Sequence, residues 1–372
     1  MTYSCNILPY MRRRRIGPSE KNHTIEVRPS RHLRIQHLNP HPRDQQFENE
    51  MLMFKQYKNT GMPSSGFFTI PGRYHGSNNY HDDTLELQHS LPLSENNAAQ
   101  ASVYHSSYEQ TGNKGTTATK DIVIFFIHGV GGSSDIWLAQ MKYFSDQGYE
   151  IVAPDLIGHG FSCTVRDAKA YHFKEIAADV EELFDRYCKR KNVLIGHSYG
   201  ASFATYLARK RPRRVIRLIL ISGGPPTPLM PQPGVFSLPY CLLACIKPCL
   251  LCRFYKSAFY SKQSPVVPKE VAFNIPAYVL QYTMNGQDWP DGDEVYHEWI
   301  TCPSLLIYGA YDQLVSLQEE KDMAKVIHNS RLEVIEDAGH MVMIEAPAEV
   351  NRLIEEFISQ PPTQMTAEYI TT

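Results

Sequence analysis

From residue 121 to about residue 360, short apolar runs alternate with segments whose apolar residues recur at the spacing of a helix. This alternation constrains the fold strongly, because strands that alternate with amphipathic helices pack into a parallel sheet covered on both faces. The expected strands are 122–127, 149–153, 192–195, 215–221, 304–308 and 331–335. We therefore predict an α/β fold, with a mostly parallel sheet that carries helices on both faces.

The chain before this region has two patterns. Residues 24–38 alternate between apolar and polar on either side of a turn at Pro29 and Ser30, which predicts a β-hairpin. Residues 39–120 are rich in Asn, Ser, His, Gly and Thr and show no sustained period. The expected organisation is a basic disordered N-terminus at 1–23, the hairpin at 24–38, a disordered insertion at 39–120, the α/β domain at 121–360 and a tail at 361–372.

Between residue 223 and about residue 300 the alternation stops, and prolines, aromatic residues and cysteines take over. We expect this segment to be an inserted lid. Its most apolar stretch, 235–252, is interrupted by Pro239, Lys247 and Pro248, which argues against a membrane-spanning helix. Apolar and basic residues stand side by side there, so we expect either peripheral membrane contact through the lid or a small lid core. The candidates for S-acylation are Cys241, Cys245, Cys249 and Cys252.

Charge and cysteine content exclude some classes of protein. The 372 residues carry a formal net charge of -2, so no global basic field would attract nucleic acid, and we exclude nucleic-acid binding as the main role. Residues 1–15 lack the apolar core of a signal peptide, and 8 cysteines in a chain this long do not make a disulfide scaffold. We expect free thiols and an intracellular location, either cytoplasmic or peripherally membrane-associated, with mitochondrial association among the candidates.

Gly196, Ser198 and Gly200 form a G-x-S-x-G motif that follows the apolar run 193–195 and precedes a helical pattern. In this context the serine sits on a tight, strained turn between a strand and a helix, and the flanking glycines relieve steric crowding. The start of the helix adds a backbone donor and a positive dipole end. We predict that Ser198 is a catalytic nucleophile.

A glycine-rich loop at residues 128–132 follows the first expected strand of the domain. In acyl transfer, one donor to the oxyanion comes from such a loop and the other from the residue after the nucleophile. We therefore assign the oxyanion hole to the backbone amides of Val130 and Tyr199.

A serine is a weak nucleophile until a base takes its proton, so the chain must supply a histidine and an orienting acid. Asp312 and His340 each follow an expected strand, at the strand ends where open α/β sheets place their active sites. The order Ser, Asp, His is the one that accompanies the G-x-S-x-G motif. We predict Asp312 as the acid and His340 as the base. The alternative acid is Asp155, which follows a strand but precedes the serine.

Together these motifs resemble the α/β-hydrolase superfamily over about 121–360. The resemblance rests on His128-Gly129, Asp155, Gly158, Gly160, Ser162, the G-x-S-x-G motif, Asp312 and Gly339-His340. It implies that the hairpin at 24–38 belongs to the same sheet. Some relatives are lysophospholipid lipases, and others are credited with acyltransferase activity through a His-x4-Asp motif, in which Glu345 replaces the aspartate here.

We expect a serine hydrolase that cleaves a carboxylic ester or thioester of a small-molecule acyl or lipid-like substrate, without a cofactor or metal. Two alternatives stay open at this point. One is acyl transfer to a lysophospholipid, and the other is a non-catalytic interaction scaffold on a hydrolase fold. The basic N-terminal region and the long polar insertion also indicate protein partners.

Overall fold

The computed structural model of the chain describes residues 22–39, 120–260 and 269–361. Most of the expected N-terminus at 1–23, the insertion at 39–120 and the tail at 361–372 lies outside these ranges.

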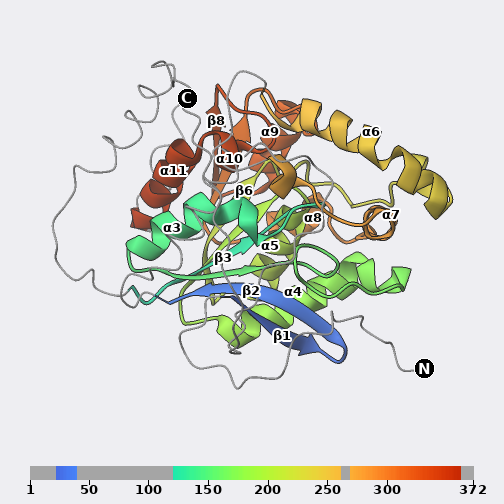
Figure 1. The fold of residues 1–372 in the computed structure, drawn as a ribbon. Coiled ribbons are helices and arrows are strands. Elements are labelled where there is room, and N and C mark those ends of the chain that lie inside the picture. Colours follow the sequence, from blue (N-terminus) through green and yellow to red (C-terminus); the bar gives the residue numbers. More distant parts are fainter. Residues whose placement is uncertain (1–21, 40–119, 261–268, 362–372) are drawn as a thin grey trace, which may run out of the picture. The chain divides into compact units, whose positions relative to one another are not determined.

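Within these described ranges, eight strands form one sheet in the order β1-β2-β4-β3-β5-β6-β7-β8 (Figure 1). The strands are β1 (Asn22–Arg28), β2 (Arg31–Leu38), β3 (Val123–Ile127), β4 (Glu150–Pro154), β5 (Asn192–His197), β6 (Val215–Ile221), β7 (Ser304–Gly309) and β8 (Ser330–Ile335). The hairpin β1–β2 is antiparallel and pairs antiparallel with β4, whereas β4, β3, β5, β6, β7 and β8 run parallel. The mostly parallel sheet predicted from the alternation is confirmed.

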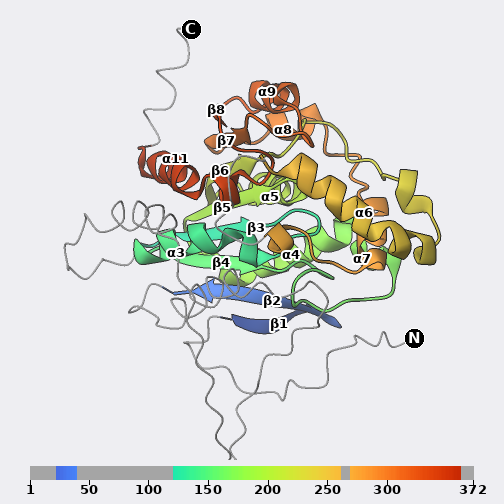
Figure 2. The same cartoon turned by 45° about the horizontal axis from the view of Figure 1, so that its top comes forward.

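Helices cover both faces of the sheet (Figure 2). Successive residues of a strand point to opposite faces, so a strand of apolar residues needs packing partners on both sides. On β3, Val123 and Phe125 belong to one buried cluster, and Ile124 and Phe126 belong to another. The helices packed in the first cluster are α4 (Phe173–Tyr187), α5 (Tyr199–Lys210) and α9 (Leu317–Val326), and those in the second are α3 (Leu138–Asp146) and α11 (Pro347–Ser359). The short helices η2 (Ser134–Trp137), η3 (Ala168–Tyr171) and α10 (Val342–Glu345) complete this part.

The segment expected as a lid is mainly helical. It contains η4 (Gly234–Ser237), α6 (Tyr240–Ala258), η5 (Lys269–Ala272), α7 (Ala277–Asn285) and α8 (Glu294–Glu298). Pro239 occupies the N-cap of α6, and Pro248 lies inside the helix. Because Pro248 is exposed, water can reach the backbone around it, which makes the missing donor tolerable. None of the helices in the described ranges is long and apolar enough to cross a membrane.

Candidate active site

Ser198 lies on the turn between β5 and α5, at the N-cap of the helix. Its φ of 52° is in the left-handed region, which residues other than glycine rarely adopt. The turn also needs its two glycines: a Cβ on Gly196 would come within 2.5 Å of the carbonyl oxygen of Gly200, and one on Gly200 would collide with the carbonyl oxygen of Ile127. The local sequence therefore presents a serine on a strained, tightly packed turn.

The glycine-rich loop lies directly against this turn. A Cβ on Gly129 would be 2.9 Å from the Cβ of Ser198, so only glycine allows the loop to approach so closely. Gly131 has a φ of 83°, which turns the backbone after Val130. Among the described residues, no protein acceptor takes a hydrogen bond from the backbone N–H of Val130 or of Tyr199. Both predicted oxyanion donors are thus free.

His128 fixes the start of the loop, a role that the sequence pattern did not reveal. Its Nδ1 is 2.7 Å from the carbonyl oxygen of Gly129, and its Nε2 accepts the backbone N–H of Leu156 at 2.9 Å. The imidazole must therefore be neutral, with the proton on Nδ1. Burial is the main cause that lowers the pKa of His128 below its usual value, in agreement with this arrangement.

Asp312 and His340 meet beyond the ends of β7 and β8. Nδ1 of His340 donates to Oδ2 of Asp312 at 2.8 Å, and both side chains are buried. The other carboxylate oxygen of Asp312 accepts the backbone N–H groups of Leu314 and Val315 at 2.8 and 3.0 Å. The carboxylate is therefore locked in place, and the pair leaves Nε2 of His340 free to exchange a proton.

His197 connects the serine turn to the histidine loop. It precedes Ser198, its Nε2 lies 3.0 Å from the carbonyl oxygen of His340, and the two imidazole rings are 4.7 Å apart. Burial first, and the neighbouring His340 second, hold the pKa of His197 well below its usual value. Within the described ranges, no hydrogen bond joins the Ser198 hydroxyl to His340, a contact that often tightens only when substrate binds.

Glu345 anchors the loop that carries His340. One carboxylate oxygen accepts the backbone N–H of Gly339 at 2.8 Å, and the other accepts that of Tyr260 at 2.7 Å. The backbone N–H of Met341 also donates to the carbonyl oxygen of Ala258 at 3.1 Å. The histidine loop is therefore tied to the end of α6. In the sequence, Glu345 stood out only as a departure from the His-x4-Asp motif.

Asp155, the alternative acid, is fully occupied by structural contacts. It accepts hydrogen bonds from the backbone and hydroxyl of Ser134 at 2.8 and 2.7 Å, from the backbone of Phe161 at 2.9 Å and from Arg34 at 3.2 Å. Burial alone would raise its pKa, but the charge of Arg34 and these donors bring the pKa below its usual value. Ser162 binds the carbonyl oxygen of Asp155 at 2.6 Å and so holds the same loop. Asp155 makes no contact with His340 in the described part of the chain.

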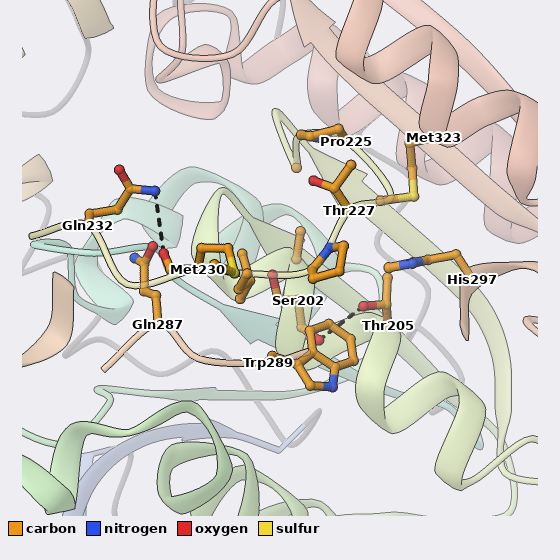
Figure 3. A pocket seen from close by; sticks show the side chains of 14 residues that line it. Ser202, Thr205, Pro225, Thr227, Met230, Gln232, Gln287, Trp289, His297 and Met323 are labelled. Carbon is orange, nitrogen blue, oxygen red and sulfur yellow. Dashed lines mark hydrogen bonds between the residues drawn. The ribbon is translucent and has the colours of Figure 1, made fainter. Parts of the chain in front are cut away.

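A cavity of about 300 Å³ lies beside the first turns of α5. Figure 3 shows Ser202 and Thr205 of this helix on its wall, with Trp289 and His297 nearby. None of the three predicted triad residues lines it, so it adjoins the helix of Ser198 rather than the Asp312–His340 pair.

The described residues contain no group of three or more His, Cys, Asp or Glu side chains placed to hold a metal ion.

Comparison with known proteins identifies the class. Residues 124–353 match the alpha/beta hydrolase family, and the chain belongs to this family. It is 45% identical over 262 residues to Protein ABHD8 of Mus musculus, a match that covers 69% of this chain and 60% of that protein. The chain thus spans only about 60% of the length of this curated relative.

Solved esterases show the same fold. The esterase of Exiguobacterium antarcticum has a TM-score of 0.55 at 22% identity, over 65% of this chain and 93% of that one. The esterase of Thermogutta terrifontis has a TM-score of 0.55 at 23% identity, over 65% of this chain and 90% of that one. At such low identity the likeness establishes the α/β-hydrolase fold and nothing finer.

Proposed function

We propose that the chain is a serine hydrolase that cleaves carboxylic esters or thioesters of acyl or lipid-like substrates. The observation that carries the proposal is the buried hydrogen bond of 2.8 Å between Asp312 and His340, beyond the same edge of the sheet that presents Ser198 on a left-handed turn. The strained φ of Ser198 supports the same assignment, because a G-x-S-x-G motif places its nucleophile on such a turn between a strand and a helix.

In the proposed mechanism, Oγ of Ser198 attacks the carbonyl carbon while Nε2 of His340 takes the hydroxyl proton. Asp312 holds the imidazole in the required tautomer and stabilises its positive charge. The backbone N–H groups of Val130 and Tyr199 bind the developing oxyanion, an effect usually worth about 3 to 4 kcal/mol for one donor. His340 then protonates the leaving group, and water releases the acyl group from Ser198.

Hydrolysis is favoured over acyl transfer by the contacts of Glu345. Acyl transfer through a His-x4-Asp motif would need a carboxylate free to act beside His340. Both oxygens of Glu345 instead accept backbone N–H groups, at 2.8 and 2.7 Å. This carboxylate therefore positions the histidine loop, and water is the proposed acceptor of the acyl group.

The proposal is tested by comparing product formation by the wild type and by Ser198→Ala. The substrates are p-nitrophenyl esters of increasing chain length, long-chain acyl thioesters and lysophospholipids. Ser145→Ala, a partly buried serine of α3 that is not among the predicted site residues, is the matched control. We expect turnover of at least one substrate class by the wild type and the control, and a loss of roughly 10³-fold or more in Ser198→Ala. Equal turnover by Ser198→Ala would exclude Ser198 as the nucleophile.

A further inference from the structure

Helix α6 carries four free thiols on one exposed stripe. Cys241, Cys245, Cys249 and Cys252 are all free and all exposed. Spacings of four, four and three residues keep them within an arc of about 80°, because a helix advances about 100° per residue. Free cysteine is among the residues most often buried, so four exposed thiols on one stripe are unusual for packing alone.

The rest of this face is apolar or basic. Leu242 is 51% exposed, and it lies about 100° from Cys241 around the helix. Arg253 and Lys256 are exposed, and they lie at about 120° and 60° around the helix from Cys241, close to the thiols. In the ranges that the structure describes, neither of these two cations forms an ion pair. The helix contains no Asp or Glu between Tyr240 and Ala258.

The opposite side of α6 is the one that packs on the protein. Leu243 is fully buried, Leu250 packs against the first hydrophobic cluster, and Phe254 packs against the second. The helix lies beside α7 and along the outside of the described part (Figure 2). One side of the helix therefore packs on the protein and the other faces outward, so the cysteine stripe is not the core of the lid.

The geometry does not suit a metal or a disulfide. Side chains three or four residues apart on a helix have Cβ atoms about 5 to 6 Å apart, whereas a disulfide requires about 3.5 to 4.5 Å. No set of three or more potential ligands on the described residues is placed to hold a metal. Each thiol is thus available for a separate covalent modification.

We propose that the exposed stripe of α6 is an S-acylation site, and that its acyl chains anchor the helix in the plane of an anionic membrane surface. In this reaction the sulfur of a cysteine attacks the carbonyl carbon of a long-chain acyl thioester. A new thioester bond forms to the cysteine, the bond to the donor sulfur breaks, and the proton of the cysteine thiol passes to the departing thiol. Arg253 and Lys256 add attraction to anionic headgroups.

The C-terminal end of this helix lies next to the candidate active site. The carbonyl oxygen of Ala258, the last residue of α6, accepts the backbone N–H of Met341, the residue after His340. A helix held at a membrane would therefore bring the histidine loop to the lipid surface. The proposal does not depend on hydrolase activity, since the four thiols are not part of the triad.

The test is thiol exchange on the full chain expressed in eukaryotic cells. Free thiols are blocked, thioesters are cleaved with hydroxylamine, and the released thiols are labelled with a maleimide that adds mass. We expect a hydroxylamine-dependent mass shift in the wild type and in Cys188→Ser, a partly exposed cysteine outside α6. The shift should disappear when all four cysteines of α6 are changed to serine. Mass spectrometry of the wild-type peptide that contains α6 provides a second measurement that needs no variant.

A shift that persists in the fourfold serine variant, or no shift and no acylated α6 peptide in the wild type, would overturn the proposal.

Vesicle flotation tests the proposed membrane contact. The acylated chain should float with phosphatidylcholine vesicles that contain phosphatidylserine, and Arg253→Ser and Lys256→Ser should each weaken this binding about fivefold. Equal flotation of the wild type and the fourfold serine variant would exclude the acyl anchor.

Discussion

Asp312 and Asp155 are both buried carboxylates that follow a strand, and their contacts distinguish their roles. Asp312 accepts a hydrogen bond from His340, whereas Asp155 accepts hydrogen bonds from Ser134, Phe161 and Arg34. Asp312→Asn should keep the fold and lose roughly 10⁴-fold in turnover, because an amide no longer holds the required histidine tautomer. The measurement is turnover together with a thermal unfolding curve.

Asp155→Asn should lower stability and largely keep turnover. It removes a buried charge opposite Arg34, so the free energy of unfolding should fall by about 3 to 5 kcal/mol. Turnover per folded molecule should change much less than in Asp312→Asn. If Asp155→Asn removed activity without lowering stability, and Asp312→Asn stayed active, the assignment of the acid would be reversed.

Glu320 is a buried carboxyl group near Asp312, and burial is the main cause that raises its pKa to about 8. Its folded-state pKa is above the unfolded value, so the folded state holds the proton more tightly. The stability that this provides is complete below the ordinary pKa of glutamate, declines as the pH rises, and is lost once the pH passes about 8.

Glu320→Gln should therefore flatten the pH dependence of stability between about pH 5 and pH 8. Urea unfolding at several pH values measures this, with at most about 1.4 kcal/mol per pH unit from one proton. The exposed Glu298→Gln serves as the control, and its profile should follow the wild type. Parallel profiles for the wild type and Glu320→Gln would show that Glu320 does not titrate in this range.

At the scale of elements, the sequence pattern predicted the strands of the domain to within a residue or two. Each strand is a short apolar run with clear ends, and β5 was expected at 192–195 but extends through His197. The contacts between elements could not be predicted in the same way. Glu345 binds Tyr260, and His197 binds His340, across sequence separations that no local period encodes. The helices between Gly223 and about residue 300 were not predicted, because their prolines and aromatic residues obscure the helical spacing.

The tether from Glu345 to the histidine loop makes a prediction at this scale. Glu345→Gln leaves one oxygen acceptor for two backbone N–H groups, so the free energy of unfolding should fall by about 1 to 3 kcal/mol. The turnover number should fall more than KM rises, because His340 is less well positioned. Glu349→Gln, an exposed partner of Arg352 on α11, is the control and should have little effect on either quantity. Unchanged stability and turnover in Glu345→Gln would contradict the tether.

At the scale of the whole molecule, we expect that most of the long segment between β2 and β3 can be removed, because the sheet register places its two ends close together. Leu38 at the end of β2 pairs with Ile151, and Val123 at the start of β3 pairs with Glu150 on the same strand β4. The two ends are thus about two strand spacings apart, or about 10 Å. Replacement of residues 45–115 by a linker of about eight Gly and Ser residues should keep the domain folded. Its stability should be unchanged or slightly higher, because closure of a shorter loop costs less entropy. A large loss of melting temperature would show that the removed segment packs on the domain.

The central claim is that Ser198 is an activated nucleophile on a hydrolase fold. The most direct measurement is labelling of the full chain with a fluorophosphonate probe, followed by mass spectrometry to locate the modified residue. We predict one modified residue, Ser198, with labelling lost in Ser198→Ala and His340→Ala and retained in Ser145→Ala. Two results would contradict the account. One is a wild-type chain that stays unlabelled although its thermal unfolding curve shows that it is folded. The other is a label on another serine that persists in Ser198→Ala.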